Sequence, residues 1–161
     1  MGRSALPTIP LIVFGIIEPL LLVVAYASGM KNPFVFFADQ APHHPIAASA
    51  FTPSAVAVSL QLINVYAFLA AVAVACSFTR DAFTARVYLF FISLADYGHV
   101  YAVYRAVGEE YFWNYAGWNS MVAGNVGVSL GLNVFRVLTL VGAFGPVRST
   151  VAKGDLVKKR V

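Results

Sequence analysis

Four long apolar stretches, separated by short polar or proline-rich connections, dominate the pattern of this 161-residue chain. They run over about residues 7–29, 54–78, 84–106 and 119–144, and each can cross a bilayer as a helix of about 20 residues. Because lipid offers no hydrogen-bonding partner to an open backbone, apolar segments of this length form helices rather than strands. The pattern therefore predicts an all-α fold, an integral membrane four-helix bundle.

Composition agrees with this fold and limits the chemistry. The chain is 60% hydrophobic and 11% charged, with a mean hydropathy of +0.76, as in a membrane protein. We expect one domain over residues 1–147 and a short basic tail over residues 148–161. The lone Cys76 excludes a disulfide framework and a cysteine-based metal site. No ligand pattern surrounds His43 and His44, so neither a metal nor a cofactor is predicted.

Basic residues are distributed unequally between the two ends of the predicted helices. Four spans would place the N-terminus, the 79–84 connection and the tail on one side. That side carries Arg3, Arg80, Arg86, Arg148, Lys153, Lys158, Lys159 and Arg160, and the other side carries Lys31 and Arg105. The bias predicts that both termini are cytosolic. A basic tail can also bind nucleic acid, but no motif supports this function here, and no nucleic-acid partner is expected.

The last four residues are Lys158-Lys159-Arg160-Val161, with lysines third and fourth from the end. This arrangement resembles the dilysine retrieval signal of endoplasmic-reticulum membrane proteins, which is read on the cytosolic side. An ordinary basic tail, attracted to anionic lipid by about 1 kcal/mol per residue, explains the same residues equally well. The localisation that the sequence favours is a multi-pass protein of the endoplasmic reticulum.

Ionisable and amide side chains interrupt the apolar stretches near the middle of the membrane. At a rise of about 1.5 Å per residue, Glu18 lies roughly 18 Å from the cytosolic end of a core about 30 Å thick. Asp96 reaches a similar depth, and His99 lies slightly closer to the lumen. The same half of the bilayer receives three amides, Gln61, Asn64 and Asn125. Ionisable groups are costly at this depth, so a functional site is the default hypothesis.

Helical spacing places these polar groups on shared faces. Residues three apart, such as Gln61 and Asn64 or Asp96 and His99, lie on one face of a helix. We therefore expect the polar stripes of all four helices to surround one cavity, which Trp118 could cover. The structural alternative is a polar network that fixes the register of the bundle. Since interhelical hydrogen bonds contribute only about 0.6 kcal/mol, two carboxyl groups and an imidazole are a costly way to build one.

Other features of the helices carry separate expectations. Pro19 cannot donate a backbone hydrogen bond, so the first helix should kink beside Glu18. Gly127 and Gly131 form a small-residue face through which helices, or copies of the chain in a homo-oligomer, would associate. Arg136, about 26 Å from the lumenal end, is expected to extend to the cytosolic headgroups. The connection over residues 30–53 is rich in apolar residues and is either a lid on the lumenal side or a simple surface loop.

Blocks of sequence in a fixed order resemble a fungal family of small membrane proteins with a domain of unknown function, DUF7704. The blocks are Leu6-Pro7-Thr8-Ile9-Pro10 with Phe14-Gly15-x-x-Glu18-Pro19, then Leu60-Gln61-Leu62-x-Asn64-Val65-Tyr66, Ala95-Asp96-x-Gly98-His99 and Trp118-Asn119-x-Met121-x-x-Gly124-Asn125. The resemblance implies a four-helix membrane domain of unsettled function. In architecture alone, the chain is also similar to the emopamil-binding and sigma-2-receptor (EXPERA-like) proteins. These endoplasmic-reticulum proteins bind sterol-like amphiphiles, and some isomerise sterol double bonds.

The leading functional hypothesis is a small membrane enzyme that transfers protons on an isoprenoid, sterol or polyketide-type substrate, by isomerisation or cyclisation, as in fungal secondary metabolism. Its catalytic candidates are Glu18, Asp96 and His99. Its substrate-binding candidates are Gln61, Asn64, Trp118, Asn119 and Asn125. The alternative is a non-catalytic receptor, chaperone or partner subunit that binds lipid or sterol in the same cavity. Either function implies a hydrophobic small molecule or lipid, and the membrane, as partners.

Overall fold

The computed structural model describes residues 4–150 of the chain. The described part is built of helices and connecting turns, in the order α1 (Thr8–Ile12), η1 (Val13–Ile17), α2 (Glu18–Lys31), α3 (Pro33–Ala38), η2 (Ala48–Ala50), α4 (Pro53–Ser77), α5 (Ala82–Trp113), η3 (Tyr115–Gly117), α6 (Ser120–Val122), η4 (Ala123–Val128) and α7 (Ser129–Leu140). The predicted all-α class is confirmed. Most of the predicted basic tail, including the dilysine-like Lys158 and Lys159, lies outside the described residues.

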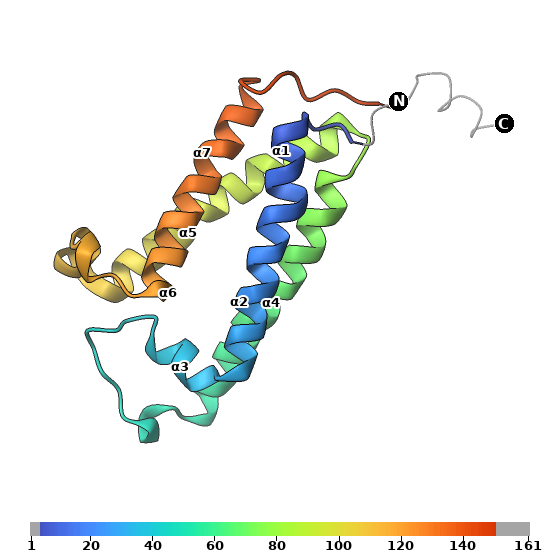
Figure 1. Ribbon diagram of the computed structural model, residues 1–161. Helices are drawn as coiled ribbons and strands as arrows, with labels where there is room; N and C mark the ends of the chain where they lie inside the picture. Colours follow the sequence, from blue (N-terminus) through green and yellow to red (C-terminus); the bar gives the residue numbers. More distant parts are fainter. Residues whose placement is uncertain (1–3, 151–161) are drawn as a thin grey trace.

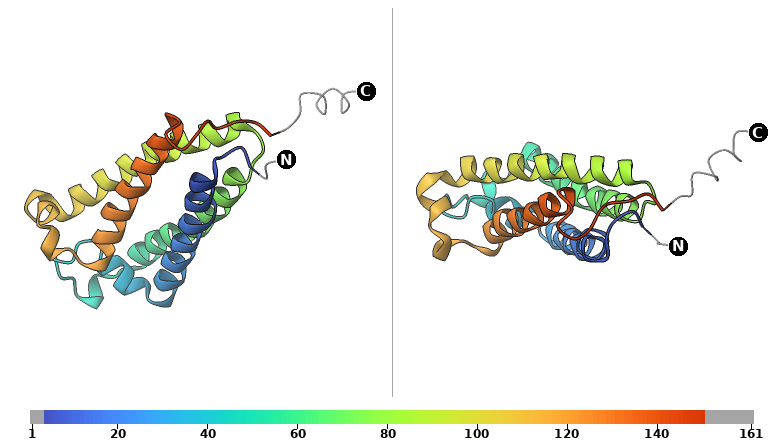
Figure 2. Two further views of the ribbon diagram at one scale, coloured as in Figure 1. Left: turned by 45° about the horizontal axis from the view of Figure 1, so that its top comes forward. Right: turned by 90° about the horizontal axis from the view of Figure 1, so that it is seen from above.

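The long helices form two antiparallel pairs (Figure 1). The continuous helix of α1, η1 and α2 packs along α4, and α5 packs along α7. The two further views in Figure 2 show the same pairing from other directions. The helix that corresponds to the third predicted stretch, 84–106, is longer than expected. It continues to Trp113 across a kink at Gly108, whose φ is 75°. The space between the pairs is where the candidate site lies.

Three segments that are distant in sequence join at one end of the molecule. The backbone N–H of Ala5 donates to Thr79 O at 2.8 Å, and that of Arg148 donates to Ala5 O at 3.1 Å. Similarly, Thr150 N–H donates to Arg80 O at 3.0 Å. The structure thus brings together the segments that the charge pattern assigned to one side of the membrane. We call this the terminal end, and the opposite end, which carries α3 and η3, the loop end.

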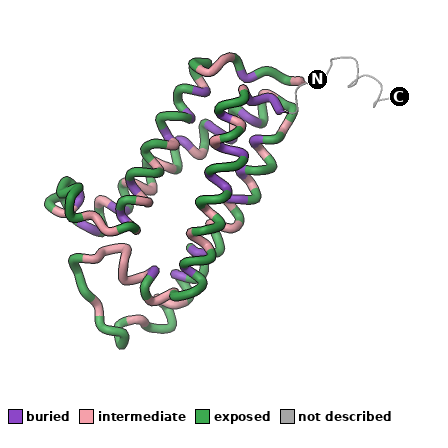
Figure 3. Tube along the Cα trace, in the orientation of Figure 1, coloured by how far each residue is buried: buried purple, intermediate pink, exposed green. Residues whose placement is uncertain are grey.

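Three helices are long and apolar enough to cross a membrane: Thr8–Lys31, Pro53–Ser77 and Ser120–Leu140. Figure 3 shows that exposed residues recur along these helices. Large apolar side chains are among them, including Leu20, Val24, Val58 and Phe68. Soluble proteins rarely expose so much apolar surface, whereas lipid covers it at no cost. The structure therefore supports a membrane protein with three spanning helices. The fourth span, which α5 would supply, stays a prediction.

Two turns of wider, π-helical backbone interrupt the spanning helices. The turn η1 directly precedes Glu18 and Pro19, and η4 contains Asn125. Because Pro19 has no N–H to donate, the regular bonding pattern of the preceding turn cannot continue through it. The disturbance expected at this position therefore takes the form of a π-helical turn that ends at Glu18. Such turns are frequent at functional sites. Here η4 lines the cavity described below, and η1 directly precedes its lining residue Glu18.

Close helix packing occurs at Gly29 rather than at the predicted glycine face. A Cβ atom added at Gly29 would lie 2.8 Å from Ile63 Cγ1, which shows how tightly α2 approaches α4. A Cβ atom at Gly127 or Gly131 would meet nothing within 4 Å, and both glycines are exposed. The Gly127/Gly131 face thus packs against no other helix within the chain. Association of two copies through it stays a prediction.

The start of α5 is capped by Asp81. Its Oδ2 accepts hydrogen bonds from Thr84 N and Thr84 Oγ1, both at 2.8 Å, and its Oδ1 accepts a weaker one from Ser149 Oγ at 3.4 Å. These bonds, that from the Thr84 backbone foremost, hold the pKa of Asp81 below its usual value. A lowered folded-state pKa means that the cap stabilises the protein at neutral pH and loses this effect as the pH falls through that pKa.

We therefore expect Asp81→Ala to lower the thermal unfolding temperature at neutral pH. The difference from wild type should shrink once the pH falls below the ordinary aspartate range near about 3.9. Thermal unfolding followed by circular dichroism over a pH series measures both effects. Asp81→Asn, which keeps an oxygen acceptor, is the matched control and should lie between the two. A difference that persisted unchanged in acid would contradict an ionised cap.

Candidate functional site

A cavity of about 630 Å³ lies between the two helix pairs. Its walls are mostly apolar and include Leu21, Leu22, Leu62, Leu69, Ile92 and Leu132. One end of it is formed by the charged residues Glu18, Asp96 and Arg136, which pair with one another. His99, Asn125 and Ser129 add polar groups to the lining further towards the loop end. The volume falls within the range of pockets that enclose one drug-sized ligand, about 300–1,000 Å³. An apolar cavity with a few converging polar groups is the usual form of a small-molecule site.

Arg136 lies between the two carboxyl groups at the polar end. Its Nη1 donates to Asp96 Oδ2 at 2.6 Å, and its Nη2 donates to Glu18 Oε1. The side chain is only 1% exposed, and its guanidinium lies 5.3 Å from the centroid of the Phe14 ring. The expectation that Arg136 extends to the headgroups is wrong. The two carboxylates supply, inside the chain, the counter-charge and acceptors that it would otherwise reach at the membrane surface.

Asn133 completes this arrangement, and the sequence analysis missed it. Its Nδ2 donates to Ser93 O at 2.8 Å, to Ser93 Oγ at 3.0 Å and to Asp96 Oδ2 at 3.2 Å. Asn133 is buried and precedes Arg136 by three residues, so both lie on one face of α7. That spacing was the available signal in the sequence. By fixing Asp96 Oδ2, Asn133 and Arg136 hold the other carboxylate oxygen in one orientation.

The two carboxyl groups differ in their surroundings. Asp96 Oδ2 accepts from two donors, and its Oδ1 accepts no hydrogen bond from the described residues. Among residues 4–150, Glu18 Oε1 accepts from Arg136 alone, and the buried Glu18 Oε2 has no hydrogen-bond partner. A buried ionised oxygen without a donor is costly, whereas a protonated one carries no charge. Asp96 is therefore the better-stabilised carboxylate, and Glu18 Oε2 is the better position for a proton.

Charge counting leads to the same conclusion. Glu18, Asp96 and Arg136, which we call the charge cluster, carry one excess negative charge when all three are ionised. In an environment of low dielectric constant such an excess is unfavourable, and one added proton removes it. His99 lines the same cavity one helical turn after Asp96, and it is the second group that can take this proton. The charge cluster with His99 thus forms a neutral unit when it holds one transferable proton.

Gln61 and Asn64 do not reach this site. Both are exposed on the outer surface of α4, whose cavity-lining side chains are Leu62, Val65, Tyr66 and Leu69. The prediction that their amides point into the cavity is wrong. The buried face of α4 is set by Ile63, which packs against Gly29 of α2, and the opposite face carrying the amides is left outside. Nothing in the described residues gives either amide a hydrogen-bond partner of its own.

Trp118 and Asn119 lie at the loop end and outside the cavity lining. Trp118 Nε1 donates to Phe112 O at 3.1 Å, and its ring packs on Phe112 and Tyr115. The prediction that Trp118 covers the cavity is therefore wrong. Asn119 caps α6, with its Oδ1 accepting from Val122 N at 2.8 Å. These contacts give both residues structural positions, and Asn125 is the predicted substrate-binding residue that does line the cavity.

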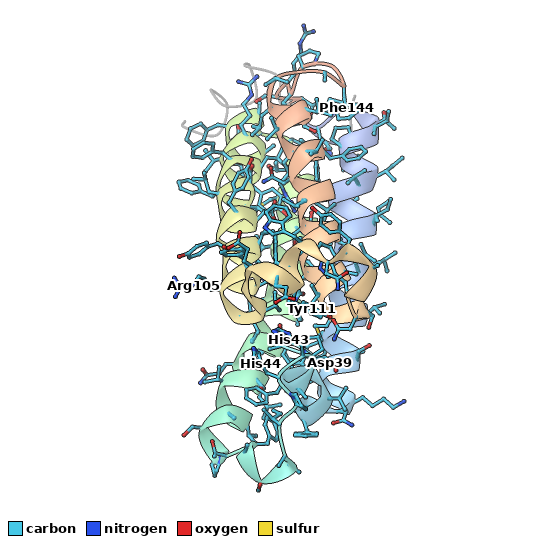
Figure 4. The ribbon with its side chains drawn as sticks, turned by 90° about the vertical axis from the view of Figure 1, so that its left-hand side faces the viewer. Asp39, His43, His44, Arg105, Tyr111 and Phe144 are labelled. Carbon is cyan, nitrogen blue, oxygen red and sulfur yellow. The ribbon has the colours of Figure 1, made fainter. Side chains whose placement is uncertain are left out.

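The segment from Pro33 to His44 closes the cavity at the loop end, as expected of a lid. Asn119 Nδ2 donates to Asp39 O at 3.0 Å, and Asn125 Nδ2 donates to Gln40 Oε1 at 3.2 Å. The His43 ring stacks on Tyr111 with centroids 4.5 Å apart, and Figure 4 shows these two labelled residues close to Asp39. Phe36 and Asp39 line the cavity directly. This segment thus bridges the two helix pairs.

The described residues contain no group of three or more His, Cys, Asp or Glu side chains that could hold a metal ion. What the cavity offers instead is a carboxyl group that can hold a proton, a paired carboxylate, an imidazole and a fixed guanidinium, all beside an apolar space. Such an arrangement can donate a proton to a neutral molecule at one point and remove one at another. It can also bind a polar head while the apolar walls enclose a chain.

Comparison with known proteins gives one relationship. No curated protein and no solved structure matches this chain. Residues 3–146 match the model of a family described as a domain of unknown function, DUF7704. The match covers both helix pairs, the π-helical turns and every residue of the charge cluster. The chain therefore belongs to the DUF7704 family.

Proposed function

We propose that this protein is a membrane-embedded enzyme that transfers protons on an apolar, unsaturated substrate such as an isoprenoid, a sterol or a polyketide. The observation that carries the proposal is the single guanidinium of Arg136 between two carboxyl groups, at the polar end of an apolar cavity. One cation for two carboxylates leaves a place for one transferable proton. The reaction class is double-bond isomerisation or cyclisation that begins with protonation.

In the proposed reaction, Glu18 is the acid. Its O–H bond breaks as a new C–H bond forms on one alkene carbon, and the neighbouring carbon becomes cationic. Asp96 or His99 then removes a proton from an adjacent carbon, which re-forms a double bond at a new position. In a cyclisation, a second double bond attacks the cation before this proton is lost. The proton gained by the base returns to Glu18 through the charge cluster, so no oxidant, reductant or cofactor is consumed.

The site also favours the cationic intermediate. After Glu18 has given up its proton, the charge cluster carries one negative charge beside the new carbocation. Tyr66 and Tyr88 line the cavity and supply aromatic rings that can stabilise a cation. The bilayer and the apolar walls exclude water, which would otherwise capture the cation. A substrate that enters from the membrane meets all of these groups without passing through the aqueous phase.

The location of this enzyme forms part of the same proposal. We place α5 as a fourth span, with the terminal end in the cytosol, because Arg80, Arg86 and Arg148 belong to that end. The dilysine-like tail favours the endoplasmic reticulum, and the resemblance to a fungal family favours a fungal source. Glycosylation-site tagging of the loop between α5 and α6 tests the orientation, because only a lumenal loop is glycosylated.

A non-catalytic lipid-binding or sterol-binding protein is the second candidate. It is favoured by the fact that Arg136 pairs with both carboxyl groups, as it would in a site built to hold a polar head rather than to move protons. In that case the bound molecule leaves unchanged. Mass spectrometry of the small molecule that copurifies with the protein separates the two functions, because only an enzyme alters the molecule that it binds.

We expect Glu18→Gln and Asp96→Asn to reduce turnover by about 10²- to 10⁴-fold, the usual contribution of a general acid or base. Each variant leaves Arg136 with one carboxylate, so the charge cluster stays neutral and the protein should fold. Mass spectrometry of small molecules that copurify with wild type and variants measures the effect. Asn64→Ala, which removes an exposed amide outside the cavity, is the control and should match wild type.

A molecule that is chemically altered only in the wild-type and Asn64→Ala samples would support the enzyme. The same molecule bound unchanged in all samples would favour the binding protein. Full turnover in both Glu18→Gln and Asp96→Asn would overturn the proton-transfer proposal. Circular dichroism of each purified variant shows that a loss of turnover does not come from unfolding.

A further inference from the structure

We propose that the cavity binds single-chain lipophilic amines, and that the ammonium group of the amine takes the place of the transferable proton of the charge cluster. This inference names a ligand class for the site and rests on the proposed function only in placing one transferable proton there. Binding requires no turnover, so it can be measured whether or not the protein is an enzyme. Three features of the site favour such a ligand: an accessible carboxylate oxygen, the balance of charge and the shape of the cavity.

The accessible acceptor is Asp96 Oδ1. Asp96 lines the cavity, its side chain is 13% exposed, and Oδ1 accepts no hydrogen bond from the described residues. Its other oxygen is held by Arg136 at 2.6 Å and Asn133 at 3.2 Å, so the carboxylate cannot easily turn away. An ammonium group carries N–H donors and a positive charge, and a carboxylate oxygen is the acceptor that such a group binds best. The position is already oriented for it.

Glu18 holds the proton that a bound ammonium group would replace. Its Oε2 is buried and has no hydrogen-bond partner in the described part of the chain, and its side chain is 9% exposed and borders the cavity. With a proton on Glu18, the charge cluster is neutral. When a cation arrives beside Asp96, that proton would create an excess positive charge, so Glu18 loses it. The amine thus replaces the proton as the group that balances two carboxylates against one guanidinium.

The other titratable and charged groups near Glu18 do not reverse this balance. Those that line the cavity or lie close to the charge cluster are Arg136 from α7, Asp96, His99 and Tyr88 from α5, Tyr66 and Cys76 from α4, and Asp39 at the loop end. Among the described residues lining the cavity, only Arg136 has a permanent positive charge, against the three carboxyl groups of Glu18, Asp39 and Asp96. An anionic amphiphile would add a further negative charge, so the cavity should reject fatty acids.

The apolar walls determine the rest of the ligand. Residues of α2 line the cavity from Glu18 to Gly29, a length of roughly 16 Å at about 1.5 Å per residue. Leucine and isoleucine side chains border most of this length. A single extended alkyl chain can therefore run from the charge cluster towards Phe36 at the loop end. The chain contributes affinity by burying apolar surface, and the ammonium group contributes selectivity.

The experiment uses the full chain in vesicles of phosphatidylcholine and three probes with the same twelve-carbon chain: dodecylamine, dodecanol and dodecanoic acid. Isothermal titration calorimetry in two buffers of different ionisation enthalpy gives affinity and protons released, with protein-free vesicles subtracted. At about pH 6 we expect saturable binding of the amine with release of one proton. The affinity should rise with pH by up to about tenfold per pH unit while Glu18 is protonated in the free protein, and then level off, since the amine itself stays charged below about pH 10.

Two variants and a control complete the test. Asp96→Asn should weaken the amine by roughly tenfold to a hundredfold, because it removes a charged acceptor. Glu18→Gln has no proton to lose, so any amine that binds should release none. Glu109→Gln removes an exposed carboxylate that does not line the cavity and should behave as wild type. If Asp96→Asn does not fold, the three probes and the proton count on wild type still decide the matter.

Saturable binding of dodecanoic acid or dodecanol as tight as that of dodecylamine would overturn the inference. Binding of the amine without proton release, or with equal affinity across the pH range, would overturn it as well. Amine binding with proton release, in a protein whose Glu18→Gln and Asp96→Asn variants both keep full turnover, would support the inference and overturn the proposed proton transfer. The reverse outcome, loss of turnover without any amine binding, would refute only the inference.

Discussion

Replacing Arg136 by methionine is expected to destabilise the protein by about 3–5 kcal/mol, the usual cost of leaving a buried charge without its partner. Arg136 is 1% exposed and is the shared partner of Glu18 and Asp96. Without the guanidinium, two carboxyl groups face each other across an apolar space, and both must become protonated. The variant also loses the contact with the Phe14 ring. Thermal unfolding in detergent and the yield of folded protein measure the effect.

The matched rescue removes the whole charge cluster. The triple variant Glu18→Gln, Asp96→Asn and Arg136→Met has no charge left to balance, and replacement of a buried ionic group by uncharged residues is often neutral or stabilising. We expect it to recover most of the stability lost in Arg136→Met while remaining inactive. This result would separate the structural cost of the cluster from its chemical role. An Arg136→Met variant as stable as wild type would instead mean that Arg136 points to the membrane surface.

Replacing Gly29 by leucine is expected to cost about 1–3 kcal/mol, as overpacking of a close contact does. A Cβ atom at this position would lie 2.8 Å from Ile63 Cγ1 and 3.0 Å from Ile63 Cδ1, so α2 and α4 must move apart. That movement would displace Glu18, which α2 also carries, and should therefore lower activity as well. The thermal unfolding temperature and the turnover of the copurifying molecule are the two measurements.

Gly127→Leu is the control for this variant, because a side chain at Gly127 meets nothing within 4 Å. It makes the same chemical change in another spanning helix and should alter the stability of the monomer by less than about 0.5 kcal/mol. The double variant Gly29→Leu with Ile63→Ala should lose less stability than the sum of its two single variants, since the new leucine fills the space that Ile63 leaves. Additive losses would show that the two residues are not in contact.

The positions of the long helices could be predicted from the sequence because local properties determine them, although α5 runs past the predicted stretch to Trp113. The length of an apolar run and the capping residues at its start, such as Thr52 before α4 and Asp81 before α5, act within one or two helical turns. The fixed rise of a helix likewise placed Glu18, Asp96 and His99 at one depth, and all three line the cavity. None of these properties depends on which helices are neighbours.

The direction in which each helix face points depends on its neighbours, and here the sequence was insufficient. Gln61 and Asn64 share a face with each other, but the packing of Ile63 against Gly29 turns the opposite face of α4 inward. The depth of Arg136 along its own helix likewise predicted contact with the headgroups, because the acceptors Glu18 and Asp96 lie on other helices. The connection between α5 and α6 folds back on itself, so Trp118 packs on Phe112 rather than over the cavity.

The sequence by itself thus determined that this is a helical membrane protein with carboxyl groups and an imidazole at one depth. Those conclusions follow from apolar length and helical rise, which are properties of single segments. Only the tertiary structure decided that Arg136 joins Glu18 to Asp96, that Asn133 supports them, and that two predicted amides stay outside. These outcomes depend on the rotation of each helix about its axis, which close contacts between distant residues determine.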